Sequence, residues 1–201
     1  MTGVVLGIDP GSRKMGWALV AGTAERPRRI DGGTLRPDAR AALPDRLGWL
    51  LQQLQSLFAA HPITALAVES AFVRDNPRTA LVLGQARGLP IALAAARGLP
   101  VHEYAPAQVK RRIVGQGRAD KHQMREMVRM LLSLAAAPPE DEADALAVAL
   151  AHLRAAQWAQ HVAPVLAVGR AAGPVRSAGP VRTAAQDAWL AALDATRGRR
   201  S

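Results

Sequence analysis

The stretch VLGIDPGSRKMGWALV, residues 5–20, contains two short apolar runs separated by a turn. Residues 4–8 and 17–20 have the length and composition of buried strands, and the intervening Asp-Pro-Gly-Ser has the residues of a tight turn. An acidic residue at the end of a buried strand gains nothing from the core. Asp9 therefore either caps the turn through its side-chain oxygens or has a chemical role, and this stretch alone leaves both interpretations open.

The elements that follow have an order typical of a mixed α/β sheet. Apolar patterning predicts a strand over 29–36, a helix over 45–60, a strand over 64–70, a long helix from 77, a strand over 101–104, and helices over 106–114, 121–134 and 141–158. Three strands followed by alternating helices and strands predict a sheet with helices on both faces. Pro90 predicts a kink or a split in the helix from 77. Tyr104, Trp17 and Trp49 are expected in the core.

The composition favours a polyanionic partner and excludes several chemistries. The chain has 26 lysines and arginines against 16 acidic residues, a formal charge of +10, which makes nucleic acid the first partner to consider. The absence of cysteine excludes disulfides, thiolate zinc sites and cysteine nucleophiles. No apolar run reaches the roughly 18 residues of a membrane span, and the start lacks the features of a signal peptide. We therefore expect a cytoplasmic protein with no membrane contact.

The character of the chain changes near residue 160. Gly-Pro-Val-Arg occurs at 173–176 and again at 179–182, and residues 151–201 hold seven arginines against two acidic residues. Ala, Gly and Pro with excess positive charge are typical of disordered tails. We predict one globular domain over 1–158 and a basic, largely disordered tail over 159–201, in which residues 184–195 have the pattern of a short helix.

Two further acidic sites stand at the ends of predicted elements. Glu69 ends the strand over 64–70 as Asp9 ends the first strand, so their carboxylates converge if these strands are neighbours. Glu69 alone could equally be a strand-end residue that meets solvent. Carboxylate oxygens suit Mg²⁺ or Mn²⁺, whereas the five histidines show no zinc-type spacing.

The third acidic site is Asp-Glu-Ala-Asp at 141–144, at the start of a predicted helix. Helix N-termini attract acidic residues through capping and the helix dipole, which is the structural alternative to a chemical role. Asp141 and Asp144 share one face at i, i+3 spacing, and Glu140 and Asp144 could share one equally well at i, i+4.

Several of these segments together resemble a known family. VLGIDPGSRKMGWALV, AVESAFVRDN, ALVLGQARG, YAPAQVKRRIVGQGRADKHQM and DEADALAVALAH are similar, in order and spacing over residues 3–155, to the successive blocks of the RuvC family of Holliday-junction resolvases. The resemblance implies a ribonuclease-H-like fold, a homodimer, and an endodeoxyribonuclease that nicks two opposed strands of four-way junction DNA in recombination and repair. It also implies association with a branch-migration complex of RuvA and RuvB type.

The resemblance assigns the acidic residues. It implies two divalent metal ions, Mg²⁺ or Mn²⁺, per active site, held by Asp9, Glu69, Asp141 and Asp144, with Asp9 bridging the two. Two such ions can orient and deprotonate a water and stabilise the leaving 3′ oxygen.

The resemblance also suggests residues that contact DNA. Lys110 and Lys121 are two of only three lysines in this arginine-rich chain, and they fall where similar family members carry lysines near DNA. We expect them to hold the phosphate around the scissile bond, with a chance position on a solvated helix face as the alternative. Phe72 would stack on an unpaired base, the alternative being a core residue. Weaker candidates for DNA contact are Arg111, Arg112, Arg118, Arg74 and Arg78.

Two competing functions are open at this point. One is a catalytically silent nucleic-acid-binding module on the same fold, against which stands the complete set of four acids and two lysines. The other is an actin-like ATPase that binds phosphates around Asp9, although the usual second phosphate loop and two-lobed length are missing.

The apolar helix from 77, hydrophobic on nearly all sides, predicts burial against a second subunit, and the family dimerises through this region.

Overall fold

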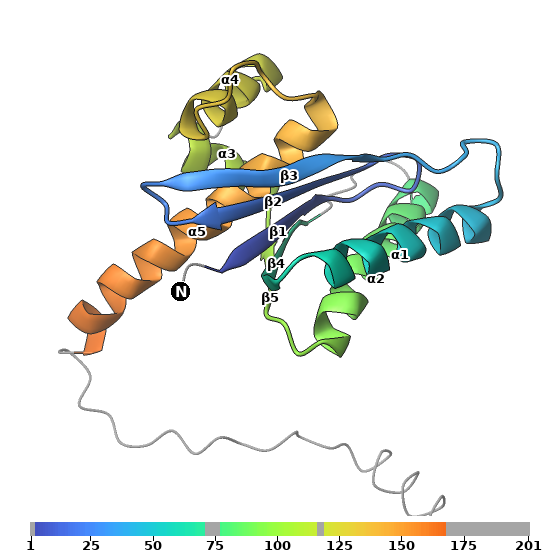
Figure 1. The fold of residues 1–201 in the computed structure, drawn as a ribbon, viewed down its shortest axis with the longest axis horizontal. Coiled ribbons are helices and arrows are strands. Elements are labelled where there is room, and N and C mark those ends of the chain that lie inside the picture. The colour runs from blue at the N-terminus through green and yellow to red at the C-terminus, as the bar shows by residue number, and fades with distance from the viewer. Residues whose placement is uncertain (1–2, 71–76, 116–118, 168–201) are drawn as a thin grey trace, which may run out of the picture. The chain divides into compact units, whose positions relative to one another are not determined.

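In a computed structural model, the chain forms a five-stranded sheet flanked by helices (Figure 1). The structure describes residues 3–70, 77–115 and 119–167. The elements in chain order are β1 (Val4–Asp9), β2 (Met15–Gly22), β3 (Pro27–Leu35), α1 (Leu43–Ala60), β4 (Ile63–Glu69), α2 (Pro77–Ala96), β5 (Val101–Tyr104), α3 (Pro106–Val114), α4 (Lys121–Leu131) and α5 (Glu140–Ala167). The predicted order of strands and helices is confirmed.

The sheet has the strand order β3-β2-β1-β4-β5. β2 pairs antiparallel with both β1 and β3, whereas β4 is parallel to β1 and β5 is parallel to β4. Ile8 of β1 is in register with Val68 of β4, so Asp9 and Glu69 follow at the same edge of the sheet. The expected neighbourhood of these two strand ends is therefore present.

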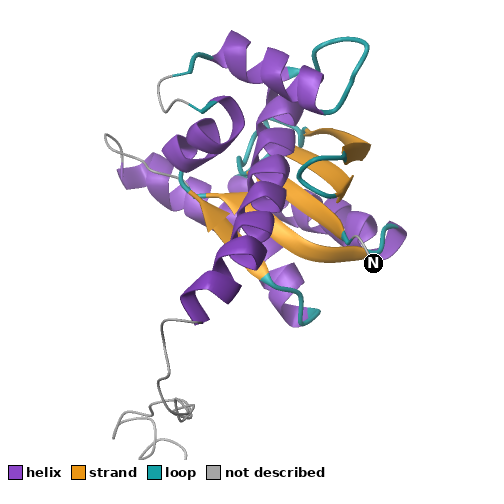
Figure 2. Cartoon of the chain, turned by 90° about the vertical axis from the view of Figure 1, so that its left-hand side faces the viewer, coloured by secondary structure: helices purple, strands orange, loops and turns teal. Residues whose placement is uncertain are grey.

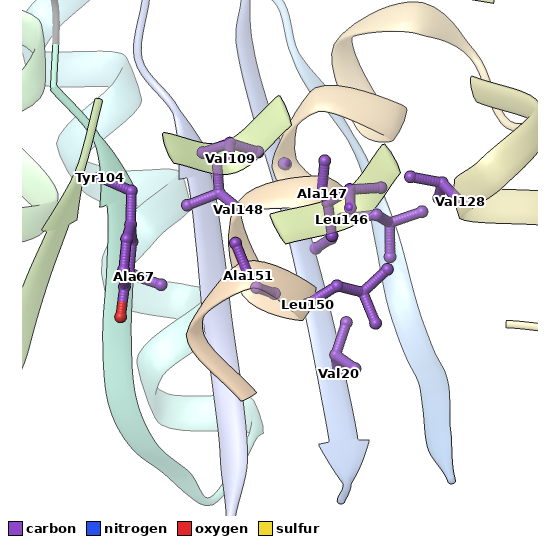
Figure 3. Close-up of a cluster of buried hydrophobic side chains, with 14 of the residues drawn as sticks. Val20, Ala67, Tyr104, Val109, Val128, Leu146, Ala147, Val148, Leu150 and Ala151 are labelled. Atoms are coloured by element: carbon purple, nitrogen blue, oxygen red, sulfur yellow. The ribbon is translucent and has the colours of Figure 1, made fainter. Parts of the chain in front are cut away.

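Helices cover both faces of the sheet, as predicted. On one face, Leu6 and Ile8 of β1 belong to a core cluster with Leu50 and Leu54 of α1 and with residues of α2. On the other face, α5 crosses the sheet and its apolar residues pack on the strands and on α3 and α4 (Figure 2). Figure 3 shows this second cluster around Val20, Ala67, Tyr104, Val109, Val128, Leu146 and Leu150.

Two glycines let α5 lie directly on the sheet. A Cβ atom at Gly7 of β1 would collide with the carbonyl oxygen of Ala145, and one at Gly16 of β2 would collide with that of Asp141. Gly16 is also the partner of Asp9 in the β1–β2 register. The absence of side chains here brings the first turn of α5 against the end of β1.

Three expectations about helices need correction. α2 runs through buried Pro90 without the split that was one of the two predicted effects, whereas the predicted kink stays a prediction. α4 ends at Leu131 rather than 134, because Ser133 has a left-handed φ of 52°. α5 continues to Ala167, beyond the predicted end at 158.

The three aromatic residues expected in the core differ in how far they are buried. Tyr104 is buried, and Trp17 is half-buried against the cluster beneath α1 and α2. Trp49 is 36% exposed, so its placement in the core was wrong. It lies on α1 next to buried Leu50, on the side of the helix that faces away from the sheet.

Helix α2 is long and apolar enough, by its 20 residues and mean hydropathy of 1.3, to meet the composition of a membrane span. Its buried residues Ala86, Leu93 and Ala94 pack on the sheet cluster with α1, while only 17% of its most apolar window is buried. Residues 1–163 form one compact unit. The predicted tail and its short helix lie almost wholly outside the described residues, so both stay predictions.

Candidate active site

The carboxyl groups of Asp9 and Glu69 interact at the adjacent ends of β1 and β4. Burial, together with the negative charges of Glu69 and Asp144, raises the pKa of Asp9 to about 8. Burial also raises the pKa of Glu69, while a hydrogen bond from Asp9 opposes that increase. The two groups thus share a proton, with Asp9 as donor and Glu69 as acceptor. Two half-buried acids in contact are too costly for a pair that serves only to cap a turn.

Asp144 of α5 joins this pair. Burial raises the pKa of Asp144, and the nearby charge of Lys121 opposes the increase. Asp144 and Glu69 line one cavity of about 180 Å³. Glu140 is instead exposed and forms an ion pair with Lys121. At the start of α5, Asp144 lies in the cavity with Glu69, and the charge of Glu140, like that of Asp141, still acts on Asp144.

Asp141 lies at the border of the cluster and has its own partners. Its Oδ2 accepts hydrogen bonds from Arg36 Nη2 at 2.9 Å and from Thr34 Oγ1 at 3.3 Å. Its charge still contributes to the raised pKa of both Asp9 and Asp144. The four acids predicted from the sequence are therefore within electrostatic reach of one another, with Asp141 tied to the end of β3.

The donor set fits a hard divalent cation. Carboxylate oxygens are the ligands that Mg²⁺ and Mn²⁺ prefer, and a cation would offset the burial and the neighbouring negative charges that raise the pKa of Asp9. As they stand, no three acidic or histidine side chains in the described part of the chain converge closely enough to hold a metal ion. The fit therefore rests on the chemistry of the acids and on their mutual repulsion.

Both predicted lysines line the same cavity as Glu69 and Asp144. Lys110 of α3 donates a hydrogen bond from Nζ to the carbonyl oxygen of Ala119 at 2.8 Å, which fixes its ammonium group beside the acids. Lys121 at the start of α4 is exposed and pairs with Glu140. The charge of Lys110 lowers the pKa of both Glu69 and Asp144. The structure therefore brings the two lysines and the carboxylates together.

The candidate arginines lie elsewhere or outside the described residues. Arg112 places its guanidinium 5.1 Å from the centroid of the Tyr104 ring, and with Arg111 it lines a separate cavity beside Trp158 of α5. Arg78, at the start of α2, lines a third cavity. Phe72, Arg74 and Arg118 fall outside the described part of the chain, so their predicted DNA contacts stay predictions.

Sequence reasoning missed the residues of β3 that hold the start of α5. Arg36 and Thr34 contact Asp141, and Arg29 pairs with Glu142, which is only 6% exposed. These partners are more than 100 positions apart in the chain. The one available signal was the remaining acidic residue of the Asp-Glu-Ala-Asp segment, Glu142, because an acid that becomes buried requires a cationic partner.

A mixed ribonuclease-H-like sheet with carboxylates at the ends of β1 and β4 and at the start of the crossing helix α5 defines a class of nucleases. The family described as "Crossover junction endodeoxyribonuclease RuvC" matches residues 5–152. The chain belongs to this family. The resemblance stated from the sequence motifs is thereby confirmed.

Individual relatives agree with this assignment. A crossover junction endodeoxyribonuclease RuvC from Magnetococcus marinus is 46% identical over 165 residues, covering 82% of this chain and 92% of the relative. One from Anaeromyxobacter sp. (strain K) is 49% identical over 170 residues, covering 84% and 89%. The solved structure of Thermus thermophilus RuvC in complex with Holliday junction substrate is similar with a TM-score of 0.73 and 34% identity, covering 77% of this chain and 95% of that chain.

A more distant structure supports the fold alone. The yeast mitochondrial Holliday junction resolvase Ydc2 is similar with a TM-score of 0.62 at 14% identity, over 83% of this chain and 84% of that one. The ribonuclease-H-like fold expected from the sequence is confirmed by these structures.

Proposed function

We propose that this chain resolves Holliday junctions in recombination and repair, by hydrolysing one phosphodiester bond in each of two opposed strands of a four-way DNA junction. The observation that carries the proposal is the carboxylate cluster of Asp9, Glu69 and Asp144, with two lysines in the wall of the same cavity. Membership of the RuvC family and the likeness to the T. thermophilus complex support junction DNA as the substrate. The net positive charge of the chain favours binding to polyanionic DNA, and the proposed place of this activity is the cytoplasm.

Asp9, Glu69, Asp141 and Asp144 would hold two Mg²⁺ or Mn²⁺ ions in each active site. Bound there, these ions would supply an activated water and stabilise charge on the leaving oxygen. Asp9 interacts with both Glu69 and Asp144, so it is the residue best placed to bind both ions. Its proton must leave before the site can act, so catalysis should favour neutral to alkaline pH.

Lys110 and Lys121 would hold the phosphodiester at the cut. Lys110 is fixed through Ala119, whereas Lys121 is exposed and held by an exposed partner, Glu140, which it can leave for a phosphate. A fixed and a mobile ammonium group on one wall of the cavity can stabilise negative charge as it develops on the phosphate oxygens. Phe72, which follows Glu69 by three residues, would stack on a base unpaired at the crossover.

The exposed side of α2 supports a homodimer. Leu81 is 64% exposed, and added Cβ atoms at Gly84 and Gly88 would meet nothing within 4 Å. The spacing of these residues places them along one face of the helix, where small side chains let another helix approach closely. A dimer would provide two active sites, one for each strand of the junction. Association with a complex of RuvA and RuvB type is part of the proposal by family membership alone.

The test is cleavage of a labelled four-way junction and of a linear duplex of the same sequence, each with Mg²⁺, with Mn²⁺ or with a chelator. The proposal predicts paired symmetric nicks in the junction with either metal, little cutting of the duplex, and binding without cutting in the chelator. Junction binding with no cutting under any metal condition would identify a catalytically silent module instead.

A second experiment tests whether each subunit cuts one strand. A mixed dimer of one wild-type and one Asp9→Asn chain should bind the junction and nick one strand only. Two nicks per mixed dimer would show that one active site serves both strands.

A further inference from the structure

A second cavity lies beside the turn that follows β1, on the side of the sheet covered by α1 and α2. It has a volume of about 670 Å³ and is lined by Ser12 and Arg13 of the turn, Arg46 in the first turn of α1, and Arg78 and Thr79 in the first turn of α2. Three of its lining residues are arginines, and none of the described residues that line it is acidic. Its polar groups are therefore cationic guanidinium groups and neutral hydroxyls, a set that recognises an anion.

Arg46 supplies a second observation. Its Nε atom is buried and has no hydrogen-bond partner among the described residues. An unpaired buried N–H donor is unfavourable in a folded protein, and a guanidinium group makes its strongest hydrogen bonds to phosphate and carboxylate oxygens. Arg13, by contrast, is exposed at the mouth of this cavity. A half-buried and an exposed arginine thus line a space whose described lining residues include no carboxylate.

The position of the cavity relative to the active site indicates what the anion is. Ser12 follows Asp9 by three residues, and an extended chain advances at most about 3.6 Å per residue, so their Cα atoms are within about 11 Å. Successive phosphates on one strand of stacked DNA advance about 3.4 Å along the helix axis. A phosphate in this cavity would therefore lie within a few nucleotides of a phosphate held at Asp9.

The two cavities lie on opposite sides of the strand ends. Glu69, Lys110 and Lys121 face the side of α3, α4 and α5, whereas Arg13 and Arg46 are on the side of α1 and α2. A strand that crosses the end of β1 would meet cations on both sides of the carboxylates. Cations on one side only would leave the strand free to pivot about the scissile phosphate.

We propose that Arg13 and Arg46 bind a backbone phosphate of the cleaved strand, within a few nucleotides of the scissile bond, and so fix the direction of the strand across the active site. This inference rests on the proposed function. The ligand chemistry is a phosphate group, which a DNA strand or free phosphate could supply, and the proposal is the DNA strand.

The test is the salt dependence of four-way junction binding by the full chain in a chelator, for wild type, Arg13→Gln and Arg46→Gln. Each lost phosphate contact should reduce the slope of log K against log salt by about 0.9. Arg28→Gln is the matched control, because it removes the same charge from an exposed arginine at the other end of the sheet, where Arg28 is in register with Ala21 and Ala21 with Val4. Arg46→Lys should retain the slope.

Both arginine variants should lose slope relative to Arg28→Gln, and slopes equal to that control would overturn the proposal. Arg13 is exposed, so Arg13→Gln keeps the test valid if Arg46→Gln folds poorly. A second arm measures thermal unfolding with inorganic phosphate alone. Stabilisation of wild type but not of Arg46→Gln, with unchanged junction slopes, would identify a free-anion site and also overturn the proposal. Wild-type junction cutting is measured in parallel, because its absence would contradict the proposed function rather than this inference.

Discussion

Arg29 of β3 donates a hydrogen bond from Nε to Oε1 of Glu142 over 2.6 Å, although the two residues are 113 positions apart. Glu142 is 6% exposed and stands between Asp141 and Asp144 in the chain. The same guanidinium donates from Nη2 to the carbonyl oxygen of Gly32 at 3.2 Å. The first turn of α5, which carries two candidate metal ligands, is therefore held on β3 by an ion pair largely out of solvent.

Arg29→Met should destabilise the fold, because it leaves the Glu142 carboxylate buried without a partner. Loss of one member of a buried pair costs about 3–5 kcal/mol, and the partial exposure of Arg29 lowers our expectation to about 2–3 kcal/mol. Urea unfolding measures this difference. The double variant Arg29→Met/Glu142→Gln should recover most of the loss, since no uncompensated charge remains. A single variant as stable as wild type would show that Glu142 is solvated.

The metal-free chain should lose stability as the pH rises. The pKa of Asp9 is raised from 3.8 to about 8, so the folded chain keeps a proton that the unfolded chain releases above about pH 4. The stabilisation from that proton is complete below pH 3.8 and is lost as the pH approaches 8. In a chelator, the free energy of unfolding should fall across this window by up to about 1 kcal/mol per pH unit.

Asp9→Asn is the control for this pH dependence. It removes the titrating group, so its stability should fall less steeply with pH, and it should be more stable than metal-free wild type at pH 8. Identical pH profiles for the two proteins in urea unfolding would contradict the raised pKa of Asp9.

Lys121→Gln should reduce the cleavage rate more than junction affinity. Removal of one preorganised group that stabilises developing charge costs about 10²–10³ in rate, whereas one exposed phosphate contact costs far less in binding. Single-turnover cleavage and a binding titration separate the two effects. Glu140→Gln is the matched control, because it breaks the Lys121–Glu140 ion pair and leaves the lysine in place. Equal losses in both variants would assign Lys121 a structural role only.

The sequence was sufficient for the part of the site that depends on local pattern. Asp9 and Glu69 each end an apolar strand, and the parallel pairing of β1 and β4 brings such ends together. At the start of α5, helical periodicity allowed either Glu140 or Asp141 to share a face with Asp144, and the family resemblance favoured Asp141. In the structure Glu140 is exposed and pairs with Lys121, although its charge still raises the pKa of Asp144.

The remaining features depend on contacts between distant segments. Arg36 and Arg29 look like ordinary exposed strand residues until α5 crosses β3, and nothing in their local sequence indicates Asp141 or Glu142. Trp49 was misplaced because its large apolar side chain suggests the core, while the helical phase set by Leu50 and Leu54 turns it away. Pro90 was expected to disturb α2 because propensity takes no account of the packing that holds it.

Truncation after residue 167, where the described part of α5 ends, should leave junction cutting intact. The family match ends at 152 and every candidate catalytic residue precedes it. Removal of the arginines beyond residue 167 should weaken binding to linear duplex and reduce its salt dependence. Cleavage of the junction and filter binding of the duplex measure the two effects. A folded truncation that no longer cuts would place the tail in the active site.

The central claim is that the carboxylate cluster performs hydrolysis and is separate from the surface that binds the junction. The most direct measurement is single-turnover cleavage of a four-way junction by Asp9→Asn in Mg²⁺, with junction affinity measured on the same preparation. The account predicts unchanged affinity and a cleavage rate lower by about 10³-fold or more, since the substitution removes a ligand charge and preserves side-chain size. Cleavage within a few-fold of the wild-type rate would show that Asp9 is a turn residue and would contradict the metal site assigned to it.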